Sequence, residues 1–141
     1  MARSFQVTFD AEDPARLAEF WMLALGYQIQ PPPPEFASWD EWAFHMEIPE
    51  TDWNNARALV DPEGKGPRLF IQKVPEGKSA KNRVHLDVAV DPAEGQSRMD
   101  AVEELVAALV AEGATYVRHV EEHGAEWVVC CDPEGNEFCV H

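Results

Sequence analysis

The chain has 141 residues, of which 11 are basic and 26 are acidic, and its formal net charge is −15 at pH 7. A chain of this length forms one domain that buries a core without disulfides or a structural metal. Its charge repels nucleic-acid phosphates and anionic lipids, so neither nucleic acid nor membrane is an expected partner. No apolar run is long enough to span a bilayer, and residues 1–5 lack the apolar core of a signal peptide. The expected location is therefore the cytoplasm.

The first half of the chain predicts a strand, a helix and three further strands. Residues 5–11 alternate between apolar and polar side chains, which is typical of a strand with one buried face. Asp13 and Pro14 then begin a helix that ends at Gly26, with apolar residues at three- and four-residue spacing. A short strand at 27–30 precedes four prolines, which lack amide donors and end its pairing. Two more strands are predicted at 56–60 and 68–74.

A 25-residue insert at 31–55 lies where a minimal module needs only a turn. Ser38 and Glu41 form a capping-box pattern with apolar residues at helical spacing after it, which predicts a short helix. Trp39 and Trp42 either cover the sheet edge, form an interface or contact a ligand as a lid, and the sequence leaves these alternatives open. Aromatic walls suit planar or hydrophobic ligands. In a protein of charge −15, cationic aromatic compounds are the class to test first.

The second half of the chain repeats the order of the first. Residues 83–90 alternate and predict a strand. Val84 lies on its predicted core face, whereas His85 and Asp87 lie on the opposite face. A helix is predicted over 97–112, because its apolar residues form one stripe before a glycine. The remaining strands are predicted at 115–120, 126–131 and 137–140.

A repeated turn sequence indicates that the two halves are copies of one βαβββ module. The tetrapeptide Asp-Pro-Glu-Gly occurs at 61–64 and at 132–135, an offset of 71 (132 − 61). One such pair predicts two facing modules, with a ligand bound between them. For the first strands, an offset of 79 pairs His85 with Gln6 (85 − 6) and keeps polar residues on one common face. The same offset pairs Asp87 with Thr8.

The modules and turns resemble the vicinal oxygen chelate superfamily, which contains glyoxalase I, extradiol dioxygenases and bleomycin-resistance proteins. Residues 68–76, 81–87 and 127–139 are similar to its bacterial glyoxalase-like group. The resemblance implies an α+β fold, in which two tandem βαβββ modules form an open curled sheet around a cleft with the helices outside. It implies a single domain over 1–141, with module 1 at about 1–76, a short helical insert at about 31–55 and module 2 at about 82–141.

The resemblance also implies where a metal site would lie. In this superfamily the ligands come from the first and last strands of each module, and the alignment places those positions at Gln6, Gln72, His85 and Cys139. Glyoxalase I has two glutamates in this set, and here Gln72 and Cys139 replace them. An amide cannot accept a proton near neutral pH and binds divalent ions weakly, so glyoxalase I activity is not expected. The two-histidine, one-carboxylate iron site of extradiol dioxygenases does not match either.

Two functions remain as hypotheses, and whether the chain is an enzyme stays open. The first is a glyoxalase-like, bleomycin-resistance-like protein that binds a small aromatic or hydrophobic molecule in its cleft, with an atypical or absent metal site. The alternative is a metal-dependent lyase or isomerase with His85 as its catalytic residue, holding a divalent cation with Gln6, His85 and Cys139. A homodimer is also left open. The predicted ligand-binding residues are Gln6, Thr8, Trp39, Trp42, Phe70, Gln72, Asp87, Glu137 and Cys139.

Overall fold

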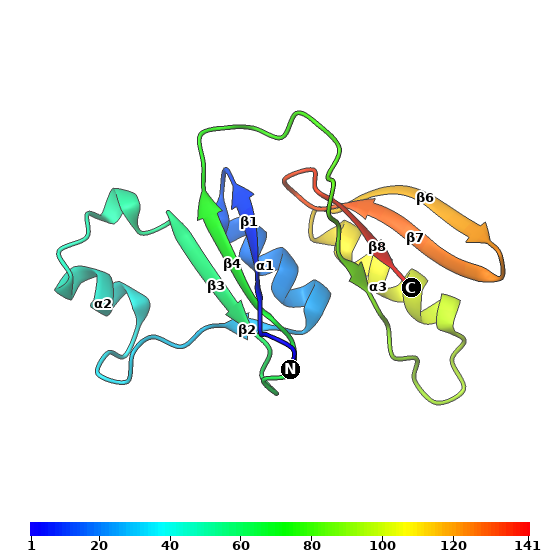
Figure 1. Cartoon of the computed structure of the whole chain (residues 1–141), viewed down its shortest axis with the longest axis horizontal. Helices are drawn as coiled ribbons and strands as arrows, with labels where there is room; N and C mark the ends of the chain where they lie inside the picture. The colour runs from blue at the N-terminus through cyan, green and yellow to red at the C-terminus, as the bar shows by residue number, and fades with distance from the viewer. The chain divides into compact units, whose positions relative to one another are not determined.

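The computed structural model describes the whole chain, Met1–His141, and divides into two compact units. Unit 1 comprises Met1–Met22 and Gly26–Gly77, and unit 2 comprises Leu23–Leu25 and Lys78–His141. Each unit contains one four-stranded sheet (Figure 1). The order of elements confirms the predicted α+β fold of two tandem βαβββ modules. None of the helices is long and apolar enough to cross a membrane.

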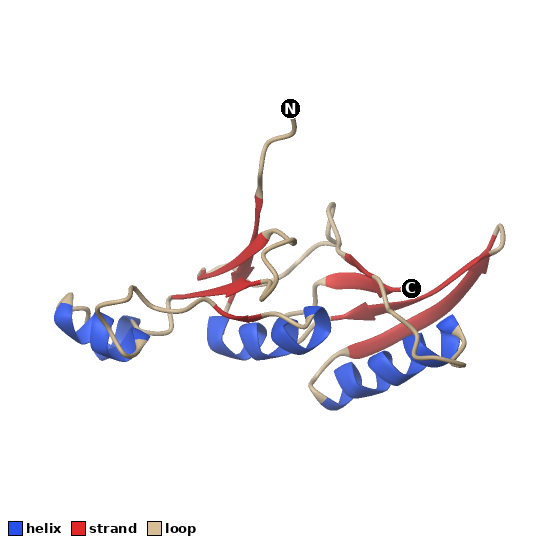
Figure 2. Cartoon of the chain, turned by 90° about the horizontal axis from the view of Figure 1, so that it is seen from below, coloured by secondary structure: helices blue, strands red, loops and turns tan.

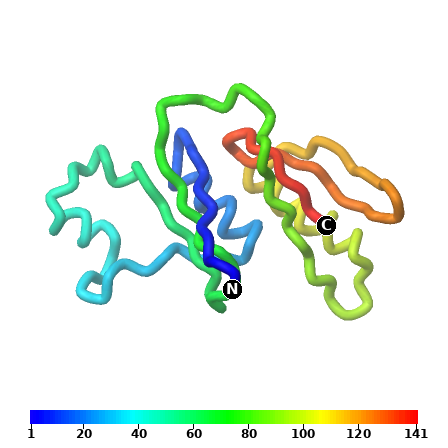
Figure 3. The backbone as a smooth tube through the Cα atoms, viewed as in Figure 1, coloured from blue at the N-terminus to red at the C-terminus, as the bar shows by residue number.

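The sheet of unit 1 has the strand order β1-β4-β3-β2. Strand β1 runs parallel to β4, whereas β3 runs antiparallel to both β4 and β2. The insert leaves this sheet after β2 and returns to it at β3 (Figure 3). The elements of unit 1 are β1 (Gln6–Ala11), α1 (Pro14–Leu25, without its last three residues), β2 (Gln28–Ile29), α2 (Trp39–His45), the 3-10 turn η1 (Glu50–Asp52), β3 (Ala56–Val60) and β4 (Arg68–Lys73).

Helix α1 begins and ends where the sequence predicts. The Asp13 carboxylate accepts a hydrogen bond from the Arg16 amide at 3.3 Å, and Gly26 adopts the left-handed conformation that ends the helix. Asn54, at the end of the insert, donates to the same carboxylate at 2.8 Å and accepts from the Ala15 amide at 2.9 Å. These bonds, with the one from Asn54 first, lower the pKa of Asp13. Asn54 thus ties the end of the insert to the start of α1.

The core of unit 1 lies between α1 and one face of the sheet. Figure 2 shows α1 on one side of the strands. Phe9 of β1 contacts Trp21 of α1, with ring centroids 5.2 Å apart. On the other face, the β1 side chains Gln6, Thr8 and Asp10 are exposed. The buried apolar residues of α1 and the sheet are Ala11, Leu17, Ala18, Phe20, Trp21, Ala24, Leu59, Leu69 and Ile71.

Unit 2 repeats this arrangement with the strand order β5-β8-β7-β6. Strand β5 is parallel to β8, and the other two pairings are antiparallel. Helix α3 is capped by Ser97 and covers one side of the strands (Figure 2). It contacts β7 and β6. The elements are β5 (Asp87–Val88), α3 (Arg98–Ala111), β6 (Thr115–Glu122), β7 (Ala125–Cys131) and β8 (Glu137–Val140).

The prediction of a strand over 83–90 is wrong in the length of the strand. Only Asp87–Val88 form β5, and Val84, predicted to be in the core, is 82% exposed. The register places the first residue of β8, Glu137, opposite residue 85, so the two residues before it, 83 and 84, have no strand residue to pair with. The segment before β5 is instead held by a side chain, because the Asn82 amide donates to the Glu137 carboxylate at 2.9 Å.

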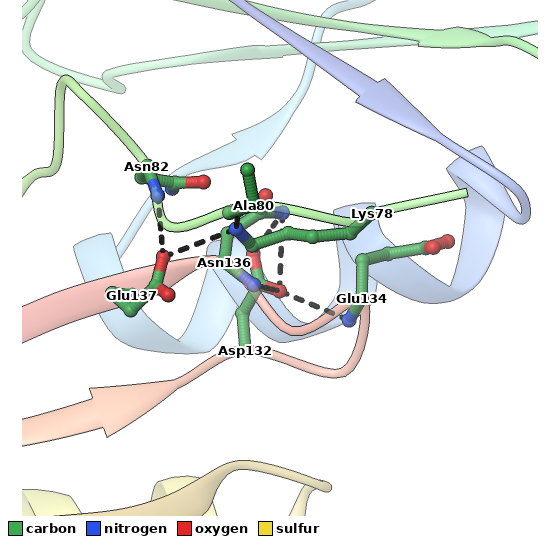
Figure 4. A network of polar contacts seen from close by, with 7 residues as sticks. All are labelled: Lys78, Ala80, Asn82, Asp132, Glu134, Asn136 and Glu137. Atoms are coloured by element: carbon green, nitrogen blue, oxygen red, sulfur yellow. Dashed lines mark hydrogen bonds and ion pairs between the residues drawn. The ribbon is translucent and has the colours of Figure 1, made fainter. Parts of the chain in front are cut away.

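The two Asp-Pro-Glu-Gly turns have the same hydrogen-bond chemistry. Asp61 accepts from the amides of Glu63, Lys65 and Gly66 at 2.8 to 2.9 Å. Asp132 accepts from the amides of Glu134 and Asn136, each at 2.9 Å (Figure 4). The bonds from Glu63 and Gly66 are the main cause of a lowered Asp61 pKa. In both turns the glycine has a positive φ, 69° at Gly64 and 85° at Gly135, which explains its place in the repeat.

Candidate functional site

In unit 1, the sheet face opposite α1 holds a fixed guanidinium group. Arg68 donates from Nε to Gln30 Oε1 and from Nη1 to Gln6 Oε1, each at 2.6 Å. Gln6 donates in turn to the Thr8 hydroxyl at 3.2 Å. The guanidinium carbon lies 5.2 Å from the centroid of the Phe70 ring. A charged group, two amides, a hydroxyl and an aromatic ring therefore form one continuous polar and aromatic surface.

Gln72 lies at the other end of the same strand pair. The register places Gln6 opposite Arg68 and Gln72 opposite Asp10. Four strand positions separate the two ends, which is about 13 Å. Gln72 donates to Asp10 at 2.7 Å. The structure thus brings Gln6 together with Thr8 and Phe70, and it does not bring Gln6 together with Gln72.

The registers also correct the proposed equivalence of Gln72 and Cys139. Thr8 lies opposite Phe70 in the parallel pair of unit 1, and Asp87 lies opposite Cys139 in the parallel pair of unit 2. With Thr8 equivalent to Asp87, Phe70 is the counterpart of Cys139. The turns agree with this: their offset of 71 takes Cys139 to residue 68, and the two extra residues between Gly64 and β4 move the counterpart to Phe70, so Gln72 was placed two positions too far along.

In unit 2, three metal-compatible side chains meet at the pairing of β5 with β8. The candidate ligand atoms of His85, Asp87 and Cys139 all lie within 4.8 Å of one another. His85 Nδ1 is 3.2 Å from the Asp87 carboxylate. Burial, followed by the charge of Asp87 and a hydrogen bond to it, raises the pKa of the Cys139 thiol. The thiol is therefore protonated at neutral pH and donates to Asp87 unless a cation displaces its proton.

This donor set fits a zinc-like ion in kind. Imidazole nitrogen, thiolate sulfur and carboxylate oxygen are the ligands such an ion prefers. Two ligand atoms of one tetrahedral ion lie about 3.3 to 3.6 Å apart. The ligand atoms of His85, Asp87 and Cys139 would therefore have to move only slightly closer together to bind a cation. Three protein ligands leave one position for water or substrate. The three side chains belong to unit 2, whereas Gln6, the other predicted metal ligand, belongs to unit 1.

Glu137 is engaged in a structural role. Its carboxylate accepts from the Asn82 amide at 2.9 Å and forms an ion pair with Lys78 at 3.2 Å (Figure 4). Lys78 also donates to the Ala80 carbonyl. The Asn82 bond is the first cause of a Glu137 pKa lowered to about 2. One oxygen of Glu137, Oε2, makes both contacts and holds the segment before β5.

The insert tryptophans connect the insert to the Arg68 surface. Trp39 donates from Nε1 to the Gln30 carbonyl at 2.6 Å, and its ring packs edge-on against Trp42 at 5.3 Å. The backbone N–H of Gln30 also donates to the Ala58 carbonyl at 2.8 Å. The residue that holds Arg68 is thus itself fixed by β3 and α2. Sequence reasoning missed Gln30 and Arg68 as site residues, although Arg68 shares the strand parity of Phe70.

Solved structures with the same fold cover nearly the whole chain. An enzyme of the glyoxalase/bleomycin resistance protein/dioxygenase family from Burkholderia phytofirmans is 20% identical, with a TM-score of 0.64, over 96% of this chain and 94% of its own. A possible glyoxalase from Bacillus cereus is 15% identical, with a TM-score of 0.62, over 99% and 98%.

A third structure with this fold is a fosfomycin resistance protein, FosX, from Listeria monocytogenes. It was solved with Mn(II) and 1S,2S-dihydroxypropylphosphonic acid, and it is 10% identical with a TM-score of 0.65 over 100% of this chain and 90% of its own. At these identities the likeness shows the fold alone.

The duplicated βαβββ sheets have the vicinal oxygen chelate fold. The sequence model of the glyoxalase-like domain matches residues 6–141, and the chain belongs to that family. Among curated proteins, none has a sequence that matches this chain.

Proposed function

We propose that this glyoxalase-like protein binds a small aromatic or hydrophobic molecule that carries one acidic group, on the sheet face of unit 1 that holds Arg68. The observation that carries the proposal is the environment of this guanidinium. The chain has 26 acidic side chains, yet Arg68 is held by two neutral amide oxygens and pairs with no carboxylate. Its charge is therefore left for a ligand.

The hydrogen bonds leave one side of the guanidinium available. Arginine has five N–H donors, and the two amides use one on Nε and one on Nη1. No protein acceptor contacts Nη2. A carboxylate accepts two parallel bonds from such a group, and hydrogen bonds between charged partners are the strong ones. Gln6 and Gln30 fix the guanidinium in advance, which reduces the entropy lost on binding.

Phe70 supplies the surface for the body of the ligand. Its half-buried ring lies beside the guanidinium, on the strand that carries Arg68. An aromatic ligand that reaches Arg68 with its acidic group stacks on this ring. The overall charge of −15 disfavours ligands with several negative charges, because the field of the protein repels them. A single acidic group is the charge that one guanidinium balances.

The proposal is tested by calorimetric titration with 2-naphthoate, a two-ring aromatic carboxylate. Arg68→Gln is expected to weaken binding by about tenfold or more, because it removes a charge-assisted contact. The matched control is Arg98→Gln, which removes the same charge from an exposed position on α3. Equal affinity of the wild type and Arg68→Gln, or an equal loss in both variants, contradicts the proposal.

A second candidate is a metal-dependent lyase or isomerase, and the His85, Asp87 and Cys139 cluster favours it. A bound divalent cation polarises an oxygen of a substrate. In this chain His85 and Cys139 would hold the cation, and Asp87 would orient the imidazole and offer an oxygen ligand. Without a carboxylate in the place of Cys139, no glutamate moves a proton as in glyoxalase I.

Cobalt spectroscopy tests the second candidate without an activity assay. Co²⁺ added to the protein is expected to give a thiolate-to-cobalt absorption band, which Cys139→Ser abolishes and His85→Ala weakens. Cys131→Ser is the control, because Cys131 lies on the neighbouring strand β7 outside the cluster. A spectrum that stays that of hydrated Co²⁺, or a band that survives Cys139→Ser, rules the site out.

A further inference from the structure

We propose that the insert of unit 1 contains a separate binding site for a small organic cation with an aromatic body. Between α2 and η1 the chain encloses an open hollow of about 780 Å³, a size typical of small-molecule pockets. It lies within residues 36–53, away from Arg68 along the chain. Its lining includes three aromatic and three acidic side chains, Phe36, Phe44, Trp53, Glu41, Glu47 and Glu50.

Hydrogen bonds and ring packing hold two aromatic walls of the hollow, Trp53 and Phe36, in place. The Trp53 indole donates to the Ile48 carbonyl at 3.0 Å, and Arg57 donates to the Trp53 carbonyl at 2.6 Å. The Phe36 ring packs against His45 with centroids 5.2 Å apart. Because these rings are fixed before anything binds, a planar ligand meets a preformed aromatic surface.

The charge of the insert selects the occupant. Its 25 residues include six carboxylates and no lysine or arginine. Glu41 accepts from the Ala37 amide at 2.7 Å, whereas no basic side chain pairs with Glu47 or Glu50. Carboxylates beside aromatic rings favour a cation, which the ring faces and the negative charges attract together. The six acidic residues are Glu35, Asp40, Glu41, Glu47, Glu50 and Asp52.

The exposure of Phe44 indicates that a ligand or another molecule covers this surface. Its side chain is 79% exposed at the edge of the hollow, which leaves a large apolar ring in water. A second copy of the chain would bring the same six carboxylates to the contact and a total charge of −15 of its own. Like charges oppose that pairing, whereas an organic cation neutralises them. Charge complementarity therefore favours the cation over a second copy.

The backbone at Glu47 permits a clean test of the carboxylates. Glu47 has a φ of 57° at the end of α2, in the left-handed region that glycine adopts without penalty. Glu47→Gly therefore removes a carboxylate from the hollow without disturbing the fold. Combined with Glu50→Gln, it removes two of the lining charges. The matched control is the double variant Glu35→Gln and Asp52→Asn, which removes two insert charges that do not line the hollow.

Calorimetry at low ionic strength with N-methylquinolinium as the probe tests the site. The Glu47→Gly, Glu50→Gln variant is expected to bind the probe about tenfold more weakly, whereas the control stays within about twofold of the wild type. Neutral quinoline at pH 8 is expected to bind more weakly than the cation. Phe44→Ala is expected to weaken binding of both compounds, because it removes part of the aromatic wall.

Three results would overturn this inference. They are quinoline binding as tightly as the cation, an equal loss in the control variant, and a dimer in light scattering that Phe44→Ser converts to monomer. The last result assigns the surface to a second copy of the chain. Because 2-naphthoate and Arg68→Gln report on the sheet face, failure of the cation site and failure of the proposed function are separate observations.

Discussion

Unit 1 and unit 2 have the same strand order and the same parallel pairing, but their equivalent positions carry different chemistry. Where unit 1 pairs Thr8 with Phe70, unit 2 pairs Asp87 with Cys139. Unit 1 thus has an amide-held guanidinium and an aromatic ring, and unit 2 has a trio of potential metal ligands. The comparison shows that turns and core residues maintain the duplicated fold, while the exposed face of each sheet is free to differ.

The largest expected effect is a difference in unfolding free energy between substitutions on the two faces of β4. Leu69 is buried and Phe70, the next residue, lies on the opposite face. Leu69→Ala is expected to cost about 2 to 5 kcal/mol of unfolding free energy, because it leaves a cavity in the core. Phe70→Ala is expected to cost far less and to weaken 2-naphthoate binding. Urea unfolding and calorimetry of both variants check this division, which fails if Phe70→Ala is the more destabilising change.

The next largest effect is a difference in unfolding free energy between substitutions in the two Asp-Pro-Glu-Gly turns. Asp132 is 2% exposed and Asp61 is only half-buried, although both accept backbone amides. Asp132→Ala leaves buried donors without acceptors and is expected to cost about 1 to 3 kcal/mol. Asp61→Ala is expected to cost less, because water replaces the lost acceptor. Equal losses of unfolding free energy in urea would show that burial does not distinguish the turns.

The smallest expected effect is the contribution of Glu137, in unit 2, to the pH dependence of stability. The pKa of Glu137 is lowered from 4.5 to about 2, so its stabilising contribution is full above pH 4.5 and is lost as the pH falls through 2. Glu137→Gln is expected to lower the Tm at pH 7. The difference in Tm from the wild type is then expected to shrink between pH 4.5 and 2. A difference that stays constant over that range contradicts the role given to this carboxylate.

Local signals in the sequence were sufficient to predict most of the fold. The Asp13 cap, the left-handed Gly26 and the Ser38 cap are short-range features, and the helices begin and end accordingly. The repeated turn predicted the duplication, because its aspartate and glycine make the turn in both copies. The length of β5 was not predictable, since it depends on where β8 begins.

The site was predictable only in part, for a related reason. Strand parity correctly put Gln6, Thr8 and Phe70 on one face of the unit 1 sheet and Asp87 and Cys139 on one face of the unit 2 sheet. Parity does not show how far along a strand a residue pairs, so Gln72 was placed two positions from the counterpart of Cys139. It also gives no hydrogen-bond partners, so the role of Gln30 in holding Arg68 was invisible.

The central claim is that the Arg68 surface of unit 1 binds a small acidic aromatic molecule, and nuclear magnetic resonance of ¹⁵N-labelled protein titrated with 2-naphthoate tests it most directly. If the surface binds this ligand, the Arg68 guanidinium N–H signals and the side-chain amide signals of Gln6 and Gln30 are expected to shift and to saturate together. Shifts confined to residues outside this surface, or an unchanged Arg68 guanidinium at saturation, would contradict it.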